Sequence, residues 1–150
     1  MTVPAHTLPA PYHYVSVGNG FTMDLPAESC QYTMTPAAPA MAMGVWAESA
    51  LNQHGVSMSA TESIYGGADV LKYDPYVPNG IAEESIPTVI IPYVKTAREG
   101  IERLGRIVTE LGSAEGNGVV IADKTEAWYI EIYSGHHWLA VKVPDDQAAV

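Results

Sequence analysis

The side chains best suited to chemistry are a single cysteine, a threonine–glutamate pair and a histidine pair. Cys30 is the only cysteine of the chain, so it is the only possible thiol nucleophile. A reactive thiolate needs a nearby base or positive charge to lower its pKa, and the neighbouring residues Glu28, Ser29 and Gln31 supply neither. We therefore interpret Cys30 as an inert side chain that is buried or partly buried.

Thr61 and Glu62 form the most promising polar pair. They end a β-compatible run that begins at Val56, and a carboxylate beside a hydroxyl at a strand end is well placed to bind a substrate amine. The alternative is a solvated strand terminus without a function. Asn52 lies in the preceding turn, where asparagine commonly hydrogen-bonds its own main chain, so we predict a structural role for it.

His136 and His137 suggest a metal site at first sight. Adjacent residues on a strand point to opposite faces, however, so we expect that the two side chains cannot bind one ion together. We predict that one faces solvent and the other a pocket or the sheet interior; the alternative is a pair of polar strand-end residues. The sequence also lacks paired-cysteine metal spacing, a phosphate-binding glycine motif and a Gly-x-Ser-x-Gly elbow.

Composition narrows the class of protein. A chain of 150 residues with 47% hydrophobic and 16% charged residues is typical of one globular domain with a sizeable core. The net charge of −10 repels phosphate backbones and anionic membranes, so we expect neither nucleic acid nor a membrane as partner. The longest apolar stretch, 86–94, is far below the roughly 20 residues of a membrane span. Without a recognisable secretory signal at Met1, the expected compartment is the cytoplasm.

Proline and periodicity divide the single domain into two parts. Residues 1–43 form a proline-rich arm, which we expect to be loosely ordered with only short strands over 12–17 and 29–35. Residues 44–150 carry regular patterns. These predict, in order, a hairpin of strands 45–51 and 56–62, an exposed loop over 65–80, helices over 86–94 and 97–111, and a meander of strands 118–122, 127–133 and 138–143.

The second helix has the clearest local signals. Thr96 and Glu99 have the spacing of a capping box, and Gly112 is a typical helix terminator. Apolar residues recur on one face, namely Ala97, Ile101, Leu104, Val108 and Leu111. Because the helices are grouped between hairpin and meander, we predict an α+β fold, with antiparallel sheets and helices on their outer faces.

Five stretches of the sequence resemble the dipeptidase A-like (PepD-type) bacterial cysteine dipeptidases, a family of N-terminal-nucleophile hydrolases. The longest covers residues 50–63, ALNQHGVSMSATES, and is similar to the family segment xxINExGVAMSATES. The others follow in the family's order and lie at 79–85 (NGIAEES), 92–100 (PYVKTAREG), 116–118 (GNG) and 135–138 (GHHW).

The resemblance implies two antiparallel sheets between helical layers, a dipeptide substrate, and neither a metal nor an organic cofactor. It also implies catalysis by the thiolate of a leading cysteine, with that residue's own α-amino group as base. No part of the chain resembles the family's opening strand, so we expect the nucleophile to lie upstream of Met1. We accordingly expect an incomplete domain, a middle fragment that is inactive by itself.

Glu62 is the residue for which the resemblance suggests the most specific role. Related acylases place an asparagine near this position to hold the oxyanion, whereas this chain has Thr61 and Glu62, so we expect Glu62 to recognise the substrate amine. Thr61, His136 and His137 are the other predicted substrate-binding residues. The alternative is a non-catalytic fragment that binds peptides or self-associates through exposed sheet edges, and a homo-oligomer is expected.

Overall fold

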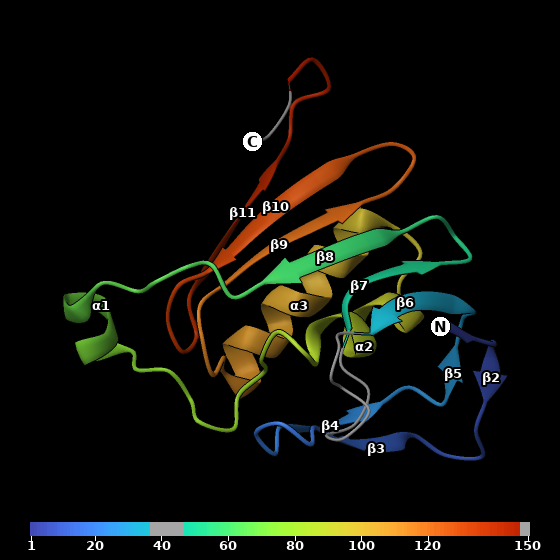
Figure 1. Cartoon of the computed structure of the whole chain (residues 1–150), viewed down its shortest axis with the longest axis horizontal. Helices are drawn as coiled ribbons and strands as arrows, with labels where there is room; N and C mark the ends of the chain where they lie inside the picture. The colour runs from blue at the N-terminus through green and yellow to red at the C-terminus, as the bar shows by residue number, and fades with distance from the viewer. Residues whose placement is uncertain (37–46, 148–150) are drawn as a thin grey trace.

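The computed structural model describes residues 1–36 and 47–147 and is built around one antiparallel sheet of seven strands (Figure 1). The strand order is β1-β6-β7-β8-β9-β10-β11. Helices α2 (Ile86–Ile90) and α3 (Ala97–Leu111) pack against one face of this sheet. The predicted α+β class, with antiparallel strands and helices on an outer face, is confirmed.

The predicted hairpin and meander are confirmed as consecutive strands of this sheet. The hairpin strands pair with Ala50 opposite Met58, and β8 continues the sheet into the meander with Met58 opposite Ile121. Val45 and Trp46, the first residues of the predicted hairpin, lie outside the described residues. The bounds are β1 (Thr2–Val3), β6 (Tyr32–Pro36), β7 (Ala47–Asn52), β8 (Ser57–Thr61), β9 (Asn117–Ala122), β10 (Ala127–Ile132) and β11 (Trp138–Lys142).

Asn52 has the structural role predicted for it. Its side-chain oxygen accepts hydrogen bonds from the backbone N–H groups of His54 and Val56, at 3.0 and 3.1 Å, and so shapes the hairpin turn. Its amide nitrogen also donates to the carbonyl oxygens of Ile91 and Val94, at 2.9 and 2.7 Å. This buried side chain therefore fastens the sheet to the segment that follows α2.

Helix α3 begins and ends where the sequence predicts. The Thr96 hydroxyl accepts a hydrogen bond from the Glu99 N–H, and the Glu99 carboxylate reaches back to the N–H of Lys95. Asp123, from the β9–β10 turn, also accepts the N–H of Ala97 at 2.8 Å. The hydrogen bonds that Asp123 accepts there and within its own turn lower its pKa to about 2.

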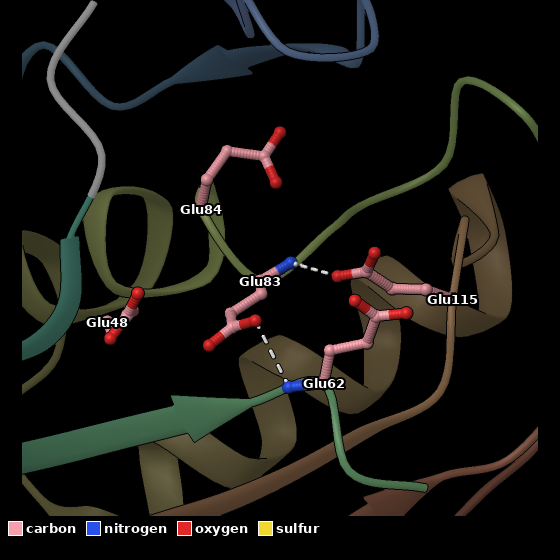
Figure 2. A pocket seen from close by; sticks show the side chains of 5 residues that line it. All are labelled: Glu48, Glu62, Glu83, Glu84 and Glu115. Atoms are coloured by element: carbon pink, nitrogen blue, oxygen red, sulfur yellow. Dashed lines mark hydrogen bonds between the residues drawn. The ribbon is translucent and has the colours of Figure 1, made fainter. Parts of the chain in front are cut away.

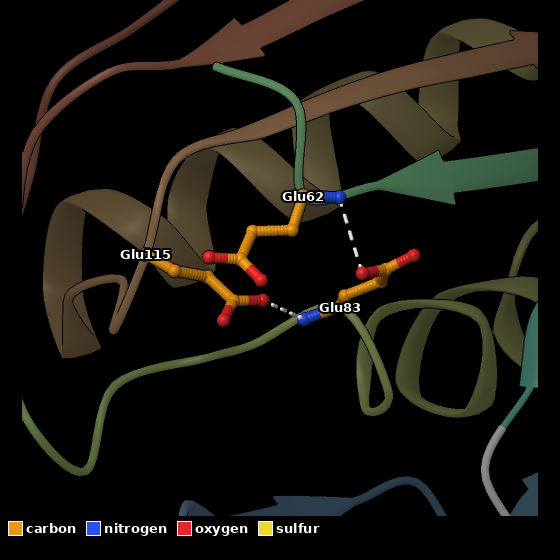
Figure 3. A group of neighbouring side chains, drawn as sticks. All are labelled: Glu62, Glu83 and Glu115. Carbon is orange, nitrogen blue, oxygen red and sulfur yellow. Dashed lines mark hydrogen bonds between the residues drawn. The ribbon is translucent and has the colours of Figure 1, made fainter. Parts of the chain in front are cut away.

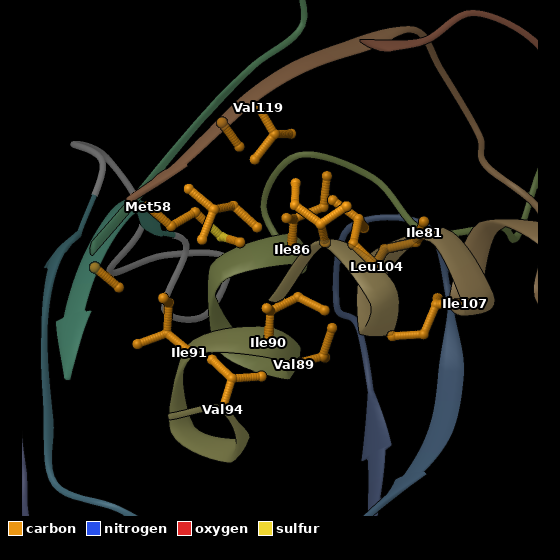
Figure 4. Packing of buried hydrophobic residues seen from close by; sticks show 14 of the residues in the cluster. Met58, Ile81, Ile86, Val89, Ile90, Ile91, Val94, Leu104, Ile107 and Val119 are labelled. Carbon is orange, nitrogen blue, oxygen red and sulfur yellow. The ribbon is translucent and has the colours of Figure 1, made fainter. Parts of the chain in front are cut away.

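The apolar face of α3 packs on the sheet together with α2. Figure 4 shows Leu104 of α3 beside Ile86 of α2, with Ile107 further along α3 and with Met58 and Val119 from the sheet. Leu111 shares the helix face of the other apolar residues, but at the C-terminal end of α3 it is 42% exposed.

The predicted helix over 86–94 consists of two short pieces. Helix α2 is followed by a 3-10 turn, η2 (Ile91–Tyr93), which contains Pro92. Proline lacks an N–H group and its ring clashes with a continuing α-helix, which explains the change. In the described residues, no helix is both long and apolar enough to span a membrane.

The described part of the proline-rich arm, residues 1–36, is better ordered than predicted. The short strands predicted at 12–17 and 29–35 are confirmed, but β6 belongs to the main sheet, as does β1, which was not predicted. The side chain of Phe21 is 1% exposed and joins the hydrophobic core, so the prediction of a loosely ordered arm was wrong. The remaining arm strands pair as β2 (His6–Thr7) with β5 (Glu28–Ser29) and β3 (Tyr12–Val15) with β4 (Thr22–Leu25).

The predicted loop over 65–80 contains one short helix, α1 (Ala68–Tyr73). None of its residues is buried, which explains why the sequence shows no helical period there. Tyr65 and Tyr73 are 85% and 84% exposed. The segment is therefore an exposed loop, as predicted, although it is not free of secondary structure.

We expect Gly105→Ala to destabilise the chain by about 1 to 2 kcal/mol. A Cβ atom on Gly105 would lie 2.3 Å from Cζ2 of Trp138, whose ring is held by its Nε1–H bond to Thr109. The clash outweighs the gain of about 1 kcal/mol in helix propensity. Urea denaturation measures the loss of stability. Combining Gly105→Ala with Trp138→Leu should remove the clash and therefore most of the loss. A Gly105→Ala variant that is more stable than wild type would contradict this packing.

Candidate functional site

Five glutamates line a pocket of about 270 Å³ at one end of the sheet (Figure 2). We call it the acidic pocket. The lining residues are Glu48, Glu62, Glu83, Glu84 and Glu115. Because these described residues include no basic side chain, their negative charges are not compensated within the lining.

Strand geometry brings Glu48 and Glu62 together. The strands β7 and β8 are antiparallel, so the beginning of β7 lies beside the end of β8. Alternate residues of a strand share a face, and Glu48 and Glu62 have the parity of the buried residues Ala50 and Ala60. Both carboxylates therefore lie on the side of the sheet that carries the helices.

Two further segments complete the pocket. Glu83 and Glu84 precede α2, Glu115 precedes β9, and a parallel bridge between Ile81 and Ser113 holds these segments side by side. The Glu83 N–H donates to the Glu115 carboxylate at 2.7 Å, and the Glu83 carboxylate accepts the N–H of Glu62 at 3.1 Å (Figure 3).

The three central carboxylates are close enough to share one cation. One carboxylate oxygen from each of Glu62, Glu83 and Glu115 lies within 4.8 Å of the other two. Burial raises the pKa of Glu83, and the charges of Glu48, Glu115 and Glu62 add to this, although the Glu62 N–H opposes it. Such a group can bind an ammonium ion, and its oxygen atoms are also of the type that bind Mg²⁺ or Ca²⁺.

Of the predicted substrate-binding residues, only Glu62 lines the acidic pocket. Thr61 has the opposite parity on β8 and is exposed on the other face of the sheet. Its hydroxyl is 2.8 Å from the Ser63 hydroxyl and 3.3 Å from the Gly118 carbonyl oxygen. A substrate contact by Thr61 stays a prediction.

His136 and His137 are brought together by Asp74. Their Nδ1 atoms lie 2.8 and 2.7 Å from the two carboxylate oxygens of Asp74, which also accepts the His136 N–H and the Ser134 hydroxyl. The expectation that the two imidazoles point to opposite faces was wrong, because both residues lie in the β10–β11 turn and not on a strand. Their predicted contact with substrate stays a prediction.

We expect Asp74→Asn to destabilise the chain by about 2 kcal/mol at neutral pH, since an amide cannot accept all of these hydrogen bonds. The hydrogen bonds from His136, Ser134 and His137 outweigh partial burial and hold the pKa of Asp74 well below 3.8, its usual value. The stabilisation is therefore present above pH 3.8 and is lost as the pH falls towards the folded-state pKa.

Urea denaturation between pH 3 and pH 7 tests this role of Asp74. The difference between wild type and Asp74→Asn should shrink at the acidic end. Asp69→Asn is the matched control, because Asp69 is an exposed carboxylate in the same loop. Equal effects of the two substitutions at neutral pH would rule the role out.

Sequence reasoning missed four of the five pocket residues. Glu83 and Glu84 directly precede a predicted helix, where acidic residues are common without a functional role, although α2 itself has no acidic residue in its first turn. Glu48 and Glu115 were not singled out. The available signal was position: Glu83 and Glu84 belong to a stretch that resembles the dipeptidases, and Glu115 directly precedes another.

Cys30 lies in a different pocket, of about 330 Å³, that His54 and Lys95 also line. The side chain is partly buried and its Sγ is 3.7 Å from the Ile91 carbonyl oxygen, to which it can donate. Burial raises the pKa of the thiol. A protonated thiol is a poor nucleophile, in agreement with the interpretation of Cys30 as an inert residue.

The fold resembles that of a solved acylase. It is similar to penicillin V acylase from Agrobacterium tumefaciens, with a TM-score of 0.57 and 12% sequence identity. The match covers 95% of this chain and 44% of the acylase.

The sequence identifies the family of the chain. The profile of peptidase family C69 matches residues 3–150, and the chain belongs to that family. It is 50% identical over 137 residues to a probable dipeptidase of Latilactobacillus sakei and 45% identical over 140 residues to probable dipeptidase B of Lactococcus lactis subsp. lactis, strain IL1403. These matches cover 91% and 93% of this chain but only 29% of each relative, so the chain spans less than a third of their length.

Proposed function

We propose that this chain is part of a dipeptidase and that its acidic pocket binds the α-ammonium group of the dipeptide. The observation that carries the proposal is the convergence of Glu62, Glu83 and Glu115 within 4.8 Å in a C69 family member. Relatives named as probable dipeptidases support the substrate class.

A free α-ammonium group distinguishes a dipeptide from the interior of a longer chain. It has three N–H donors and one positive charge, which match three carboxylate acceptors from three segments. Burial and the nearby charges of Glu48, Glu115 and Glu62 raise the pKa of Glu83, so its charged form is disfavoured, and a bound cation would favour that form. The pocket thus has the charge and the donor–acceptor pattern for amine recognition.

We further propose that the described residues contribute substrate binding and not the nucleophile. Cys30 lies outside the acidic pocket, and burial raises the pKa of its thiol. We expect Cys30→Ser to leave both dipeptide affinity and any hydrolysis by the chain unchanged, because this residue takes no part in either. Hydrolysis of a dipeptide panel that disappears in Cys30→Ser would overturn this assignment.

Calorimetric titration with dipeptides tests the proposed function. Alanyl-alanine should bind, whereas its N-acetylated form, which has no ammonium group, should bind at least about tenfold more weakly. Raising the salt concentration should weaken only the binding of the free amine, because it screens charge. Equal affinities for the two peptides, or no heat with either, would refute the proposal.

Self-association is a second candidate function, favoured by the sheet face that carries no helix. It exposes Leu51, Val120, Leu139 and Val141, which are 47%, 44%, 60% and 55% exposed. Light scattering across a concentration series tests this candidate. A mass that rises with concentration supports a homo-oligomer, and a constant monomer mass rejects it.

A further inference from the structure

A turn in the N-terminal arm lies against the segment that carries two of the pocket glutamates. The turn joins β3 to β4 and comprises residues 16–20; the pocket segment comprises residues 78–85. In Figure 2, Glu84 points away from Glu62 and towards the blue ribbon of the arm. The arm is distant in sequence from the glutamates that it approaches.

The principal contact joins Ser16 to Glu84. The Ser16 side chain is buried, donates its hydroxyl hydrogen to Oε1 of Glu84 at 2.8 Å, and accepts the N–H of Gly18 at 3.1 Å. Gly18 leaves room for this arrangement, because a Cβ atom there would lie 2.8 Å from the same Glu84 oxygen. The turn therefore orients the Glu84 carboxylate through Ser16 and leaves room for it at Gly18.

Two neighbouring contacts, one to the backbone and one to a side chain, hold the pocket segment. The Asn19 side-chain amide donates to the Gly80 carbonyl oxygen at 2.8 Å, and Asn19 also accepts the N–H of Phe21. The Tyr14 hydroxyl lies 3.0 Å from the hydroxyl of the buried Ser85. Contacts at Gly80, Glu84 and Ser85 thus bracket Glu83.

We propose that the turn of residues 16–20 is a positioning element of the acidic pocket, with Ser16 as the residue that holds Glu84 in place. The expected effect of Ser16 on dipeptide binding rests on the proposed function, whereas its effect on the position of Glu84 does not. Glu84 is one of five like-charged groups, so without a partner its carboxylate would move away from the others into solvent. The buried hydroxyl of Ser16 opposes that movement.

Hydrogen exchange tests the positioning without any ligand. In Ser16→Ala, the amide protons of Glu83 and Ser85 should exchange about tenfold faster, as expected when one hydrogen bond to a charged group is lost. Thr22→Ala is the control, since Thr22 is exposed on the same hairpin. Unchanged exchange at Glu83 and Ser85 in Ser16→Ala would overturn the proposal, whether or not the chain binds dipeptides.

A double-mutant cycle tests whether Ser16 acts through Glu84. Ser16→Ala and Gly18→Ala should each weaken the binding of alanyl-alanine several-fold, but neither should have an effect when Glu84→Ala is already present, because alanine removes the carboxylate that both residues contact. Effects that persist in Glu84→Ala would show a general structural role and would contradict the proposal. A wild-type chain that binds no dipeptide would reject the proposed function and leave the exchange result to decide the inference.

Discussion

Replacing Asn52 with alanine is expected to lower the free energy of unfolding by about 3 to 4 kcal/mol, among the larger effects of a single substitution. The Asn52 side chain is 4% exposed and makes four hydrogen bonds, to the backbone of His54, Val56, Ile91 and Val94. Alanine would leave these backbone groups without their side-chain partner. Urea denaturation at neutral pH measures the loss.

Two further substitutions make this result specific. Asn79→Ala, in an exposed turn, should have little effect. Asn52→Asp keeps the shape but turns an oxygen towards the carbonyl oxygens of Ile91 and Val94, so it should also destabilise at neutral pH. A tolerated Asn52→Ala, with less than about 1 kcal/mol lost, would mean that these hydrogen bonds are not formed.

Replacing Glu83 with glutamine is expected to weaken dipeptide binding by about tenfold to a hundredfold and at the same time to stabilise the ligand-free chain. The affinity falls because one of three carboxylates around the ammonium group loses its charge. The stability rises because a buried charge is removed, and with it the repulsion from Glu48, Glu115 and Glu62. Calorimetry measures the affinity, and urea denaturation the stability.

The stabilising effect of Glu83→Gln is expected to depend on pH. The folded-state pKa of Glu83 is raised above 4.5, its usual value, so its contribution to stability is present below pH 4.5 and is lost as the pH rises through the folded-state pKa. The advantage of Glu83→Gln should thus be largest at neutral pH and disappear in acid. Glu102→Gln, on the exposed face of α3, is the control; a Glu83→Gln variant that is less stable than wild type contradicts the assignment.

The sequence predicted the elements whose signals are local. Thr96, Glu99 and Gly112 mark the two ends of α3, and the alternation of buried and exposed residues in β8 reflects a sheet with only one covered face. In such segments the residues that specify the structure are neighbours in the chain, so the pattern is visible without tertiary information.

The order of the arm could not be predicted, because it depends on distant contacts. Prolines correctly indicated short strands, but Phe21 is buried only because the arm reaches the core, and Tyr14 and Ser16 find partners about 70 residues further along the chain. Nothing near residue 20 indicates those partners. The short helix α1 was missed for a different reason. It has no buried face, so its sequence has no apolar periodicity.

The candidate site shows the same limit. Glu62 was predicted from its place at a strand end, but the pocket arises where four separate segments meet, and no local pattern joins Glu48 to Glu115. His136 and His137 were predicted on a strand. They lie in a turn instead, where both imidazoles contact Asp74 from a distant loop. Polar residues that converge through tertiary structure cannot be found by periodicity alone.

A crystal structure of the chain with alanyl-alanine bound is the most direct test of amine recognition by the acidic pocket. We predict that the ammonium nitrogen lies within about 3 Å of carboxylate oxygens of Glu62, Glu83 and Glu115. A peptide bound elsewhere, or one whose amine points away from these three carboxylates, would contradict the proposed site.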